Sequence, residues 1–212
     1  QEADLAREMN FSGYSLERLR GLHRRMQEIL ERLRKEREVE TQSAEIFLQV
    51  SRDGLIRNSR VQRAYRDRLQ RLGKAEANTF RGKFLAAQSA LFMHMVAEDY
   101  PKAKKDTDYI FQLFNEHPHM KAEMCRALLI SLHNRSVVLN NLREYSRLPE
   151  VFREMAKVKI GGEQLRSRFF YSFYNLRLTT FCDVGEFGAA FTLLQNMREK
   201  LRKGEYHFLN RQ

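Results

Sequence analysis

A short motif occurs three times in this chain: an acidic residue, then an aromatic residue, then a small or aliphatic residue three positions later. The aromatic residues are Tyr100, Tyr145 and Phe187, which are 45 and then 42 residues apart. A motif that returns at a spacing of this size is typical of a repeat array, in which each copy is one supersecondary unit. We therefore expect the second part of the chain to contain three copies of one unit.

The stretches on both sides of each motif have the spacing of amphipathic helices. Apolar residues recur there every three or four positions, and few segments alternate apolar and polar residues as half-buried strands do. Only 3 Pro and 10 Gly interrupt the 212 residues. We predict an all-α fold in which each motif joins two antiparallel helices, over about 76–97 and 100–116, about 120–142 and 145–159, and about 163–183 and 186–203.

Two further amphipathic stretches precede these hairpins. The first extends about 25 residues from Leu16, and its apolar stripe drifts from strict heptads. Packing against a neighbouring helix is therefore favoured over a free coiled coil, which needs three or four strict heptads. The second stretch covers 41–52 and ends at Asp53-Gly54.

The chain is thus expected to have two parts. Residues 1–75 hold the N-terminal helices, and a partial match of Arg52-Asp53-Gly54-Leu55 to the motif leaves open whether they include a degenerate repeat. Residues 76–212 hold the three hairpins and, over 205–212, the start of a truncated further helix. Because the chain begins at Gln1 and stops within a predicted helix, we expect it to be a fragment of a longer protein.

The formal net charge is +11, with 38 Lys and Arg against 27 Asp and Glu, spread over both parts of the chain. Such a balance indicates either a solvated Arg-rich surface or an acidic partner such as nucleic acid. The most basic segment is a predicted helix over about 55–72. In the nucleic-acid alternative, the residues that contact phosphate are Arg57, Arg60, Arg63, Arg66 and Arg71.

Several classes of site have no support in the sequence. Cys125 and Cys182 form no CxxC pair, which argues against a disulfide scaffold or a zinc site and fits a reducing, cytoplasmic compartment. His117 and His119 flank a proline, but no third metal ligand follows at a suitable spacing. No phosphate-binding loop, nucleophile motif or membrane-spanning run occurs. We expect no enzyme, no cofactor, no metal and no membrane insertion.

One predicted helix carries a dense aromatic cluster. Aromatic side chains on several faces of a helix favour a buried helix, and a platform for base stacking is the alternative. The cluster consists of Phe169, Phe170, Tyr171, Phe173, Tyr174 and Phe181.

The third motif, Gly185-Glu186-Phe187-x-x-Ala190, resembles the turn of the tetratricopeptide repeat. Asp99-Tyr100-x-x-Ala103 and Glu144-Tyr145-x-x-Leu148 resemble it in part, so the resemblance covers about residues 80–203. The chain lacks the Trp of that family, and its period exceeds the family's period of about 34 residues. The resemblance implies antiparallel hairpins stacked as a right-handed superhelix, an α-solenoid with lengthened helices.

In tetratricopeptide repeats, the inner face of the first helices binds the ligand. The resemblance therefore implies a scaffold for protein–protein or peptide interaction, whose concave face carries polar side chains that can bind an extended backbone. The matching positions are Gln88, His133 and Asn175, with Asn134, Asn140 and Asn141 nearby. Binding of nucleic acid by the Arg-rich surface is the alternative. The sequence does not indicate an oligomeric state.

Overall fold

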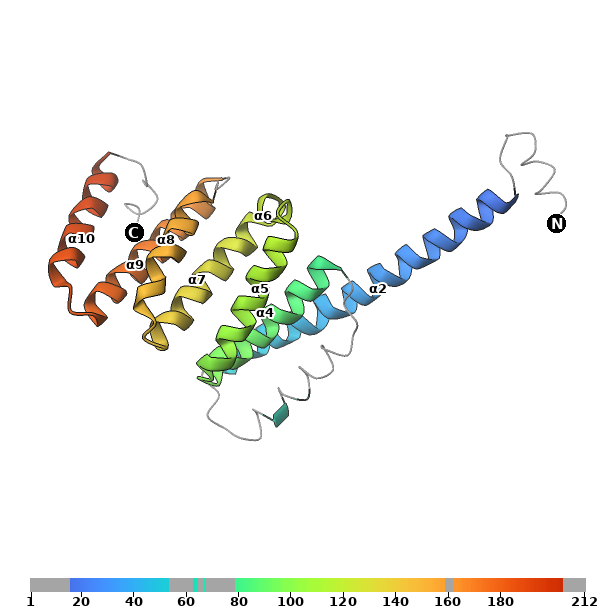
Figure 1. Ribbon diagram of the computed structural model, residues 1–212, viewed down its shortest axis with the longest axis horizontal. Helices are drawn as coiled ribbons and strands as arrows, with labels where there is room; N and C mark the ends of the chain where they lie inside the picture. Colours follow the sequence, from blue (N-terminus) through green and yellow to red (C-terminus); the bar gives the residue numbers. More distant parts are fainter. Residues whose placement is uncertain (1–15, 54–62, 65–66, 68–78, 159–161, 204–212) are drawn as a thin grey trace.

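The computed structural model describes residues 16–53, 63–64, 67, 79–158 and 162–203. These residues form α-helices, one short 3-10 helix and the turns between them, without a strand. The predicted all-α fold is thereby confirmed. The helices follow one another in a row from α2 to α10 (Figure 1). Most of the predicted helix over 55–72, and the stretch 205–212, lie outside the described residues.

Helix α2, Leu16–Asp53, is continuous over 38 residues. The sequence predicted two separate stretches here, and that division is wrong because no Gly or Pro lies between them to end the helix. Its second half packs against α4, Phe80–Val96, and buries Val39 and Ile46 almost completely. Its first half projects away from the other helices (Figure 1), so the expected packing of its apolar stripe is not found among the described residues.

Polar contacts fix α2 against the beginning of α4. The Thr79 hydroxyl donates to Glu36 Oε2 at 2.7 Å and also accepts from the Gly82 amide, which makes it the N-cap of α4. Arg81 Nη2 donates to Glu40 Oε1 at 3.0 Å. One hydroxyl therefore starts α4 and ties it to α2.

The first hairpin pairs α4 with α5, Tyr100–Glu116. Because α4 is apolar on most faces, it is covered on several sides, and the Phe84 and Phe114 rings meet edge to face at the centre of the core. Where the helices approach at the turn, His94 Nδ1 lies 2.6 Å from Asp106 Oδ2. Helix α5 ends at Glu116, as predicted, and His117, the residue before Pro118, is its C-cap.

The second hairpin is more interrupted than predicted. Its first helix is split into α6, Met120–Glu123, and α7, Cys125–Asn141. Its second helix begins as the 3-10 turn η1, Tyr145–Arg147, and continues as α8, Leu148–Lys157. Proline is tolerated in the first turn of a helix because the amide it lacks has no partner there, and Pro149 occupies that place in α8.

The third hairpin consists of α9, Glu163–Asp183, and α10, Phe187–Arg202. Its small core is built on Phe170, Tyr174 and Leu193, apart from the large core shared by the first two hairpins. The aromatic residue of the motif behaves differently here. Tyr100 and Tyr145 pack partly buried against the large core, whereas Phe187 is 68% exposed.

The three motif turns have the same backbone conformation. In each, the residue two positions before the aromatic adopts a positive φ, and the next amide donates back to the carbonyl five residues earlier. This is the Schellman arrangement that ends a helix. The positive-φ residues are Glu98 (56°), Arg143 (58°) and Gly185 (77°). The predicted repeat register is therefore matched by backbone geometry as well as by residue type.

Neighbouring hairpins are joined through the first helix of the second hairpin, since α7 packs against α5, α8 and α9. Arg135 Nη2 reaches Asp108 Oδ1 at 3.2 Å between α7 and α5, while its guanidinium lies over the Phe111 ring. The right-handed superhelix implied by the family resemblance stays a prediction. Among the described helices, none combines the length and the apolar character that crossing a bilayer requires.

Candidate binding site

The predicted polar row does not form one open surface. Asn134 is only 6% exposed, and its Nδ2 has no hydrogen-bond partner among the described residues. The prediction that it lies on an open ligand face is therefore wrong, because the residue is in the interior. Asn140 Nδ2 donates to Asp183 Oδ2 at 2.7 Å, which links α7 to α9. Asn141 Nδ2 donates to the Val137 carbonyl of its own helix at 2.8 Å. These amides are buried or already bonded within the protein.

The other three predicted residues lie on different first helices. Gln88 is half-buried on α4, His133 is half-buried on α7, and Asn175 is exposed on α9. His133 Nδ1 lies 2.8 Å from Ser172 Oγ, and burial lowers the pKa of the imidazole below its ordinary value. Neutral His133 thus helps to join α7 to α9.

A small cavity of about 190 Å³ lies beside His133, between α7 and α9. Its lining is mostly apolar, and Arg126 and Arg168 stand at its edge. The structure therefore brings together His133 and Ser172, but it brings no second residue of the predicted row to this cavity.

The arginines of the nucleic-acid alternative are described only in part. Arg63 is exposed and helical. Arg57, Arg60, Arg66 and Arg71 lie outside the described residues. The described residues therefore do not test the nucleic-acid alternative.

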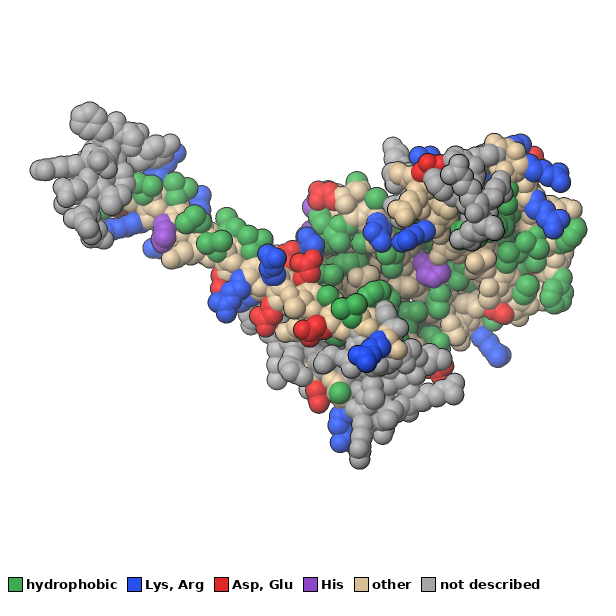
Figure 2. Space-filling model, turned by 180° about the vertical axis from the view of Figure 1, so that it is seen from behind, with side chains coloured by type: hydrophobic (Ala, Val, Ile, Leu, Met, Phe, Trp, Pro, Cys, Tyr) green, Lys and Arg blue, Asp and Glu red, His purple; other side chains and the backbone are tan. Residues whose placement is uncertain are grey.

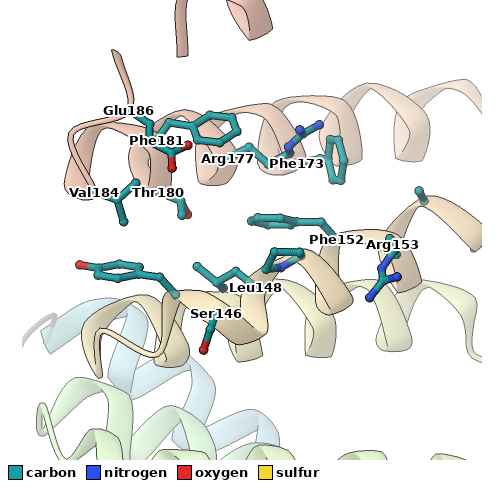
Figure 3. Close-up of a pocket in the computed structure, with 13 residues that line it drawn as sticks. Ser146, Leu148, Phe152, Arg153, Phe173, Arg177, Thr180, Phe181, Val184 and Glu186 are labelled. Carbon is teal, nitrogen blue, oxygen red and sulfur yellow. The ribbon is translucent and has the colours of Figure 1, made fainter. Parts of the chain in front are cut away.

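A larger groove runs between α8 and α9, with a volume of about 620 Å³ (Figure 3). This volume lies within the usual range for ligand sites. Apolar and aromatic side chains form most of its walls, with Leu148 and Phe152 contributed by α8 and Phe173, Phe181 and Val184 by α9 or the turn after it. Side chains from the two helices face each other across the opening in Figure 3.

The Arg177 side chain lies among the aromatic rings of this groove. Its guanidinium carbon is 5.4 Å from the centre of the Phe173 ring, 5.7 Å from Phe181 and 5.9 Å from Phe152. A guanidinium within about 6 Å of an aromatic centre is attracted to the electron-rich face of the ring. The three rings therefore hold the cation in place while the groove remains open beside it.

Few other polar groups are available in the groove. The Thr180 hydroxyl already donates to the Leu176 carbonyl at 2.8 Å, so it can accept a hydrogen bond from a ligand but not donate one. Glu186 and Arg153 are exposed and stand at the rim. The chemical character of the site is thus apolar, with one held cation inside and charges of both signs outside.

Local sequence explains why α9 presents this face. Residues 173, 177, 181 and 184 follow one another at three- or four-residue spacing, so they share the side that faces α8. Phe170 and Tyr174 point instead into the small core of the third hairpin. The prediction of a buried aromatic cluster is therefore correct for those two rings, whereas Phe173 and Phe181 line the groove.

Sequence reasoning missed this site because it treated the aromatic cluster as a unit. The available signal was an arginine four residues after one phenylalanine and four before another, Phe173-x-x-x-Arg177-x-x-x-Phe181. A charged residue at the middle of an aromatic face is unusual for a buried helix, because an isolated buried charge is costly. The face was therefore more consistent with a partly open surface.

The described residues contain no group of three or more His, Cys, Asp or Glu side chains placed to hold a metal ion. Cys125 is half-buried and Cys182 is exposed, and both are free thiols.

Comparison with known proteins adds no family to this description: no family model, no curated protein and no solved structure matches the chain.

Proposed function

We propose that this protein is a helical-repeat binding module that holds a segment of a partner protein in the groove between α8 and α9. The observation that supports the proposal best is the Arg177 guanidinium set among Phe152, Phe173 and Phe181 in an open groove. The resemblance of the motif turns to the tetratricopeptide repeat points in the same direction, since that family binds protein segments.

The groove favours a segment with an apolar or aromatic side chain beside an acidic group. The guanidinium of Arg177 lies over these rings, and its N–H groups can bind a carboxylate or a carbonyl of the ligand. The apolar walls contributed by Phe152 and Val184 would cover the neighbouring side chain of the ligand. Aromatic anchors surrounded by a few polar groups dominate the energy of many protein interfaces.

The groove takes the place of the polar row as the proposed contact surface. Asn134, Asn140 and Asn141 have little to offer a ligand because they are buried or bonded internally. Gln88 and Asn175 keep accessible side chains on the first helices and remain candidates for a wider contact. The nucleic-acid alternative rests on the net charge and on the arginines of the predicted helix over about 55–72.

Selection from a random peptide library with the full chain tests the proposal. We expect the selected peptides to share an aromatic or large apolar residue close to Asp or Glu. The Arg177→Gln variant should weaken their binding by about tenfold or more, since a hydrogen bond to a charged group contributes about 1.5–3 kcal/mol. Arg198→Gln is the matched control, because Arg198 is an exposed arginine on α10 away from the groove.

Two outcomes would contradict the proposal. One is a set of selected peptides that bind the Arg177→Gln variant as tightly as the unaltered protein. The other is a failure to select any peptide while random RNA or DNA binds with an affinity that falls steeply with salt. That second result would favour the nucleic-acid alternative.

A further inference from the structure

The first half of α2 carries an apolar stripe that the described part of the protein does not cover. We call residues 16–34 the arm, because they project from the hairpins (Figure 1). Hydrophobic side chains follow the arm on its surface in Figure 2. Six of them are between 41% and 56% exposed, namely Leu16, Leu22, Met26, Ile29, Leu30 and Leu33. A contiguous apolar surface of this kind usually marks an interaction site.

The spacing of the stripe is that of a helix-pairing seam. Leu19, Leu22, Met26, Ile29 and Leu33 alternate in steps of three and four, which are the a and d positions of about two heptads. The next d and a positions are Glu36 and Glu40, and both bind groups of the first hairpin. The seam therefore ends where the helix meets the hairpins.

Arginines run beside the seam in the same register. Arg18, Arg25 and Arg32 follow one another every seven residues, at the g position next to the apolar seam. The e positions on the other side hold His23, Leu30 and Arg37. No acidic residue occurs at either flank of the seam, and the arm as a whole carries 6 basic and 3 acidic residues.

This charge pattern is poorly suited to pairing with a second copy of the chain. In a parallel pair, each g residue faces the next e residue of the partner helix, which sets Arg32 against Arg37. In an antiparallel pair, g residues face g residues, which sets arginine against arginine. Like charges that face each other across a seam disfavour the pair. Neither arrangement supplies an opposite charge.

We propose that the arm docks an amphipathic helix of another protein, with an apolar a/d seam and Asp or Glu at its flanking positions. Such a helix covers the leucines of the arm and places carboxylates opposite Arg18, Arg25 and Arg32. The proposal uses a surface at the opposite end of the row of helices from the α8–α9 groove (Figure 1), and it does not depend on the function proposed for that groove.

Two synthetic peptides of about three heptads serve as probes. Both carry Leu at every a and d position, and one has Glu while the other has Lys at every e and g position. Repulsion between like charges discourages each peptide from pairing with itself. Binding to the full chain is measured by fluorescence anisotropy at low and at high salt.

We expect the Glu peptide to bind about tenfold or more tightly than the Lys peptide, because three exposed ion pairs replace three repulsive contacts. The preference should shrink at high salt, where exposed charges are screened. The triple charge reversal of Arg18, Arg25 and Arg32 to Glu should exchange the preference between the two peptides. Ile29→Glu should abolish binding of both, since it places a charge in the seam.

Leu48→Ala is the matched control, because Leu48 is an exposed leucine of the same helix beyond the arm. It should leave the binding of the Glu peptide unchanged. Circular dichroism of every variant shows whether α2 remains helical, so that a lost helix is not mistaken for a lost contact.

Three results would overturn the proposal. The first is equal affinity for the two peptides, or no binding to either. The second is a concentration-dependent dimer in light scattering that Ile29→Glu abolishes, which would assign the arm to a second copy of the chain. The third is binding of the full chain to vesicles of anionic lipid, lost in Ile29→Glu, with no preference for the Glu peptide.

Discussion

The Lys104 ammonium donates to both carboxylate oxygens of Glu144, at 2.6 and 2.9 Å, and so joins α5 of the first hairpin to the motif turn of the second. Arg147 Nη1 adds a third hydrogen bond to the same carboxylate at 3.0 Å. The hydrogen bond from Lys104, followed by the one from Arg147, holds the pKa of Glu144 below its ordinary value.

A double-mutant cycle with Lys104→Met and Glu144→Gln should give a coupling of about 0.5–1 kcal/mol at pH 7, because both side chains are partly exposed to water. The folded pKa of Glu144 is lowered, so the stabilisation is present above the unfolded pKa of about 4.3 and is lost as pH falls through the folded value. Urea unfolding of the four proteins at pH 7 and in acid measures the effect. A coupling that persists fully in acid would refute it.

Tyr145 should contribute to stability through the apolar area of its ring. The ring is half-buried, packs against the large core and lines the groove. We expect Tyr145→Ala to cost about 2 kcal/mol, less than the 3–5 kcal/mol typical of a fully buried aromatic residue. Tyr145→Phe should stay within about 0.5 kcal/mol. Thermal unfolding compares the two, and equal melting temperatures would show that the ring has no role between the helices.

The buried imidazole of His133 makes stability depend on pH. Because burial lowers its pKa in the folded state, the unfolded chain binds the proton more readily once pH falls below about 6.5. Stability should therefore be greatest at neutral and higher pH and decrease on acidification from pH 7 to pH 5. His133→Gln should remove the contribution of this imidazole to the decrease. The measurement is the free energy of unfolding at pH 7 minus that at pH 5, compared between the variant and the unaltered protein. His119→Gln, at an exposed histidine, is the control and should leave the decrease in place.

The motif turns predict a stabilising change. Glu98 and Arg143 hold positive φ angles that cost non-glycine residues about 1 kcal/mol or more, whereas Gly185 adopts the same conformation without that cost. Glu98→Gly and Arg143→Gly should each stabilise the protein by up to about 1 kcal/mol, and Gly185→Ala should destabilise it similarly. Denaturant unfolding provides the measurement. A loss of stability in both glycine variants would show that these side chains make contacts that outweigh the strain.

The repeat register could be predicted from the sequence because the acidic–aromatic motif coincides with a fixed turn. Asp99, Glu144 and Glu186 each donate their amide to the preceding helix and stand at the start of the next one. The end of α5 before Pro118 could be predicted for a similar local reason, because the residue before a proline is disfavoured in a helix. The continuity of α2 was missed because the sequence was divided near residue 40, where no Gly or Pro ends the helix.

The candidate site was harder to predict because it depends on distances between helices. The role of Asn140 is decided by its contact with Asp183 of α9, which helical spacing within α7 does not contain. The groove itself arises because α8 and α9 leave space between Phe152 and Phe181, and a single sequence cannot specify that separation. Only the placement of Arg177 between two phenylalanines on one face was visible beforehand.

Helix α2 passes from the arm into the packed half without a break. Because the helix is continuous, the arm is a rigid extension of the hairpins. At about 1.5 Å per residue, the arm of residues 16–34 is about 28 Å long. A flexible linker would let a bound partner sample a wide volume, whereas a continuous helix fixes both distance and direction. A protein bound along the arm would therefore lie at a fixed distance and in a fixed direction from a ligand bound at the far hairpins. The molecule would then act as a rigid spacer between two partners.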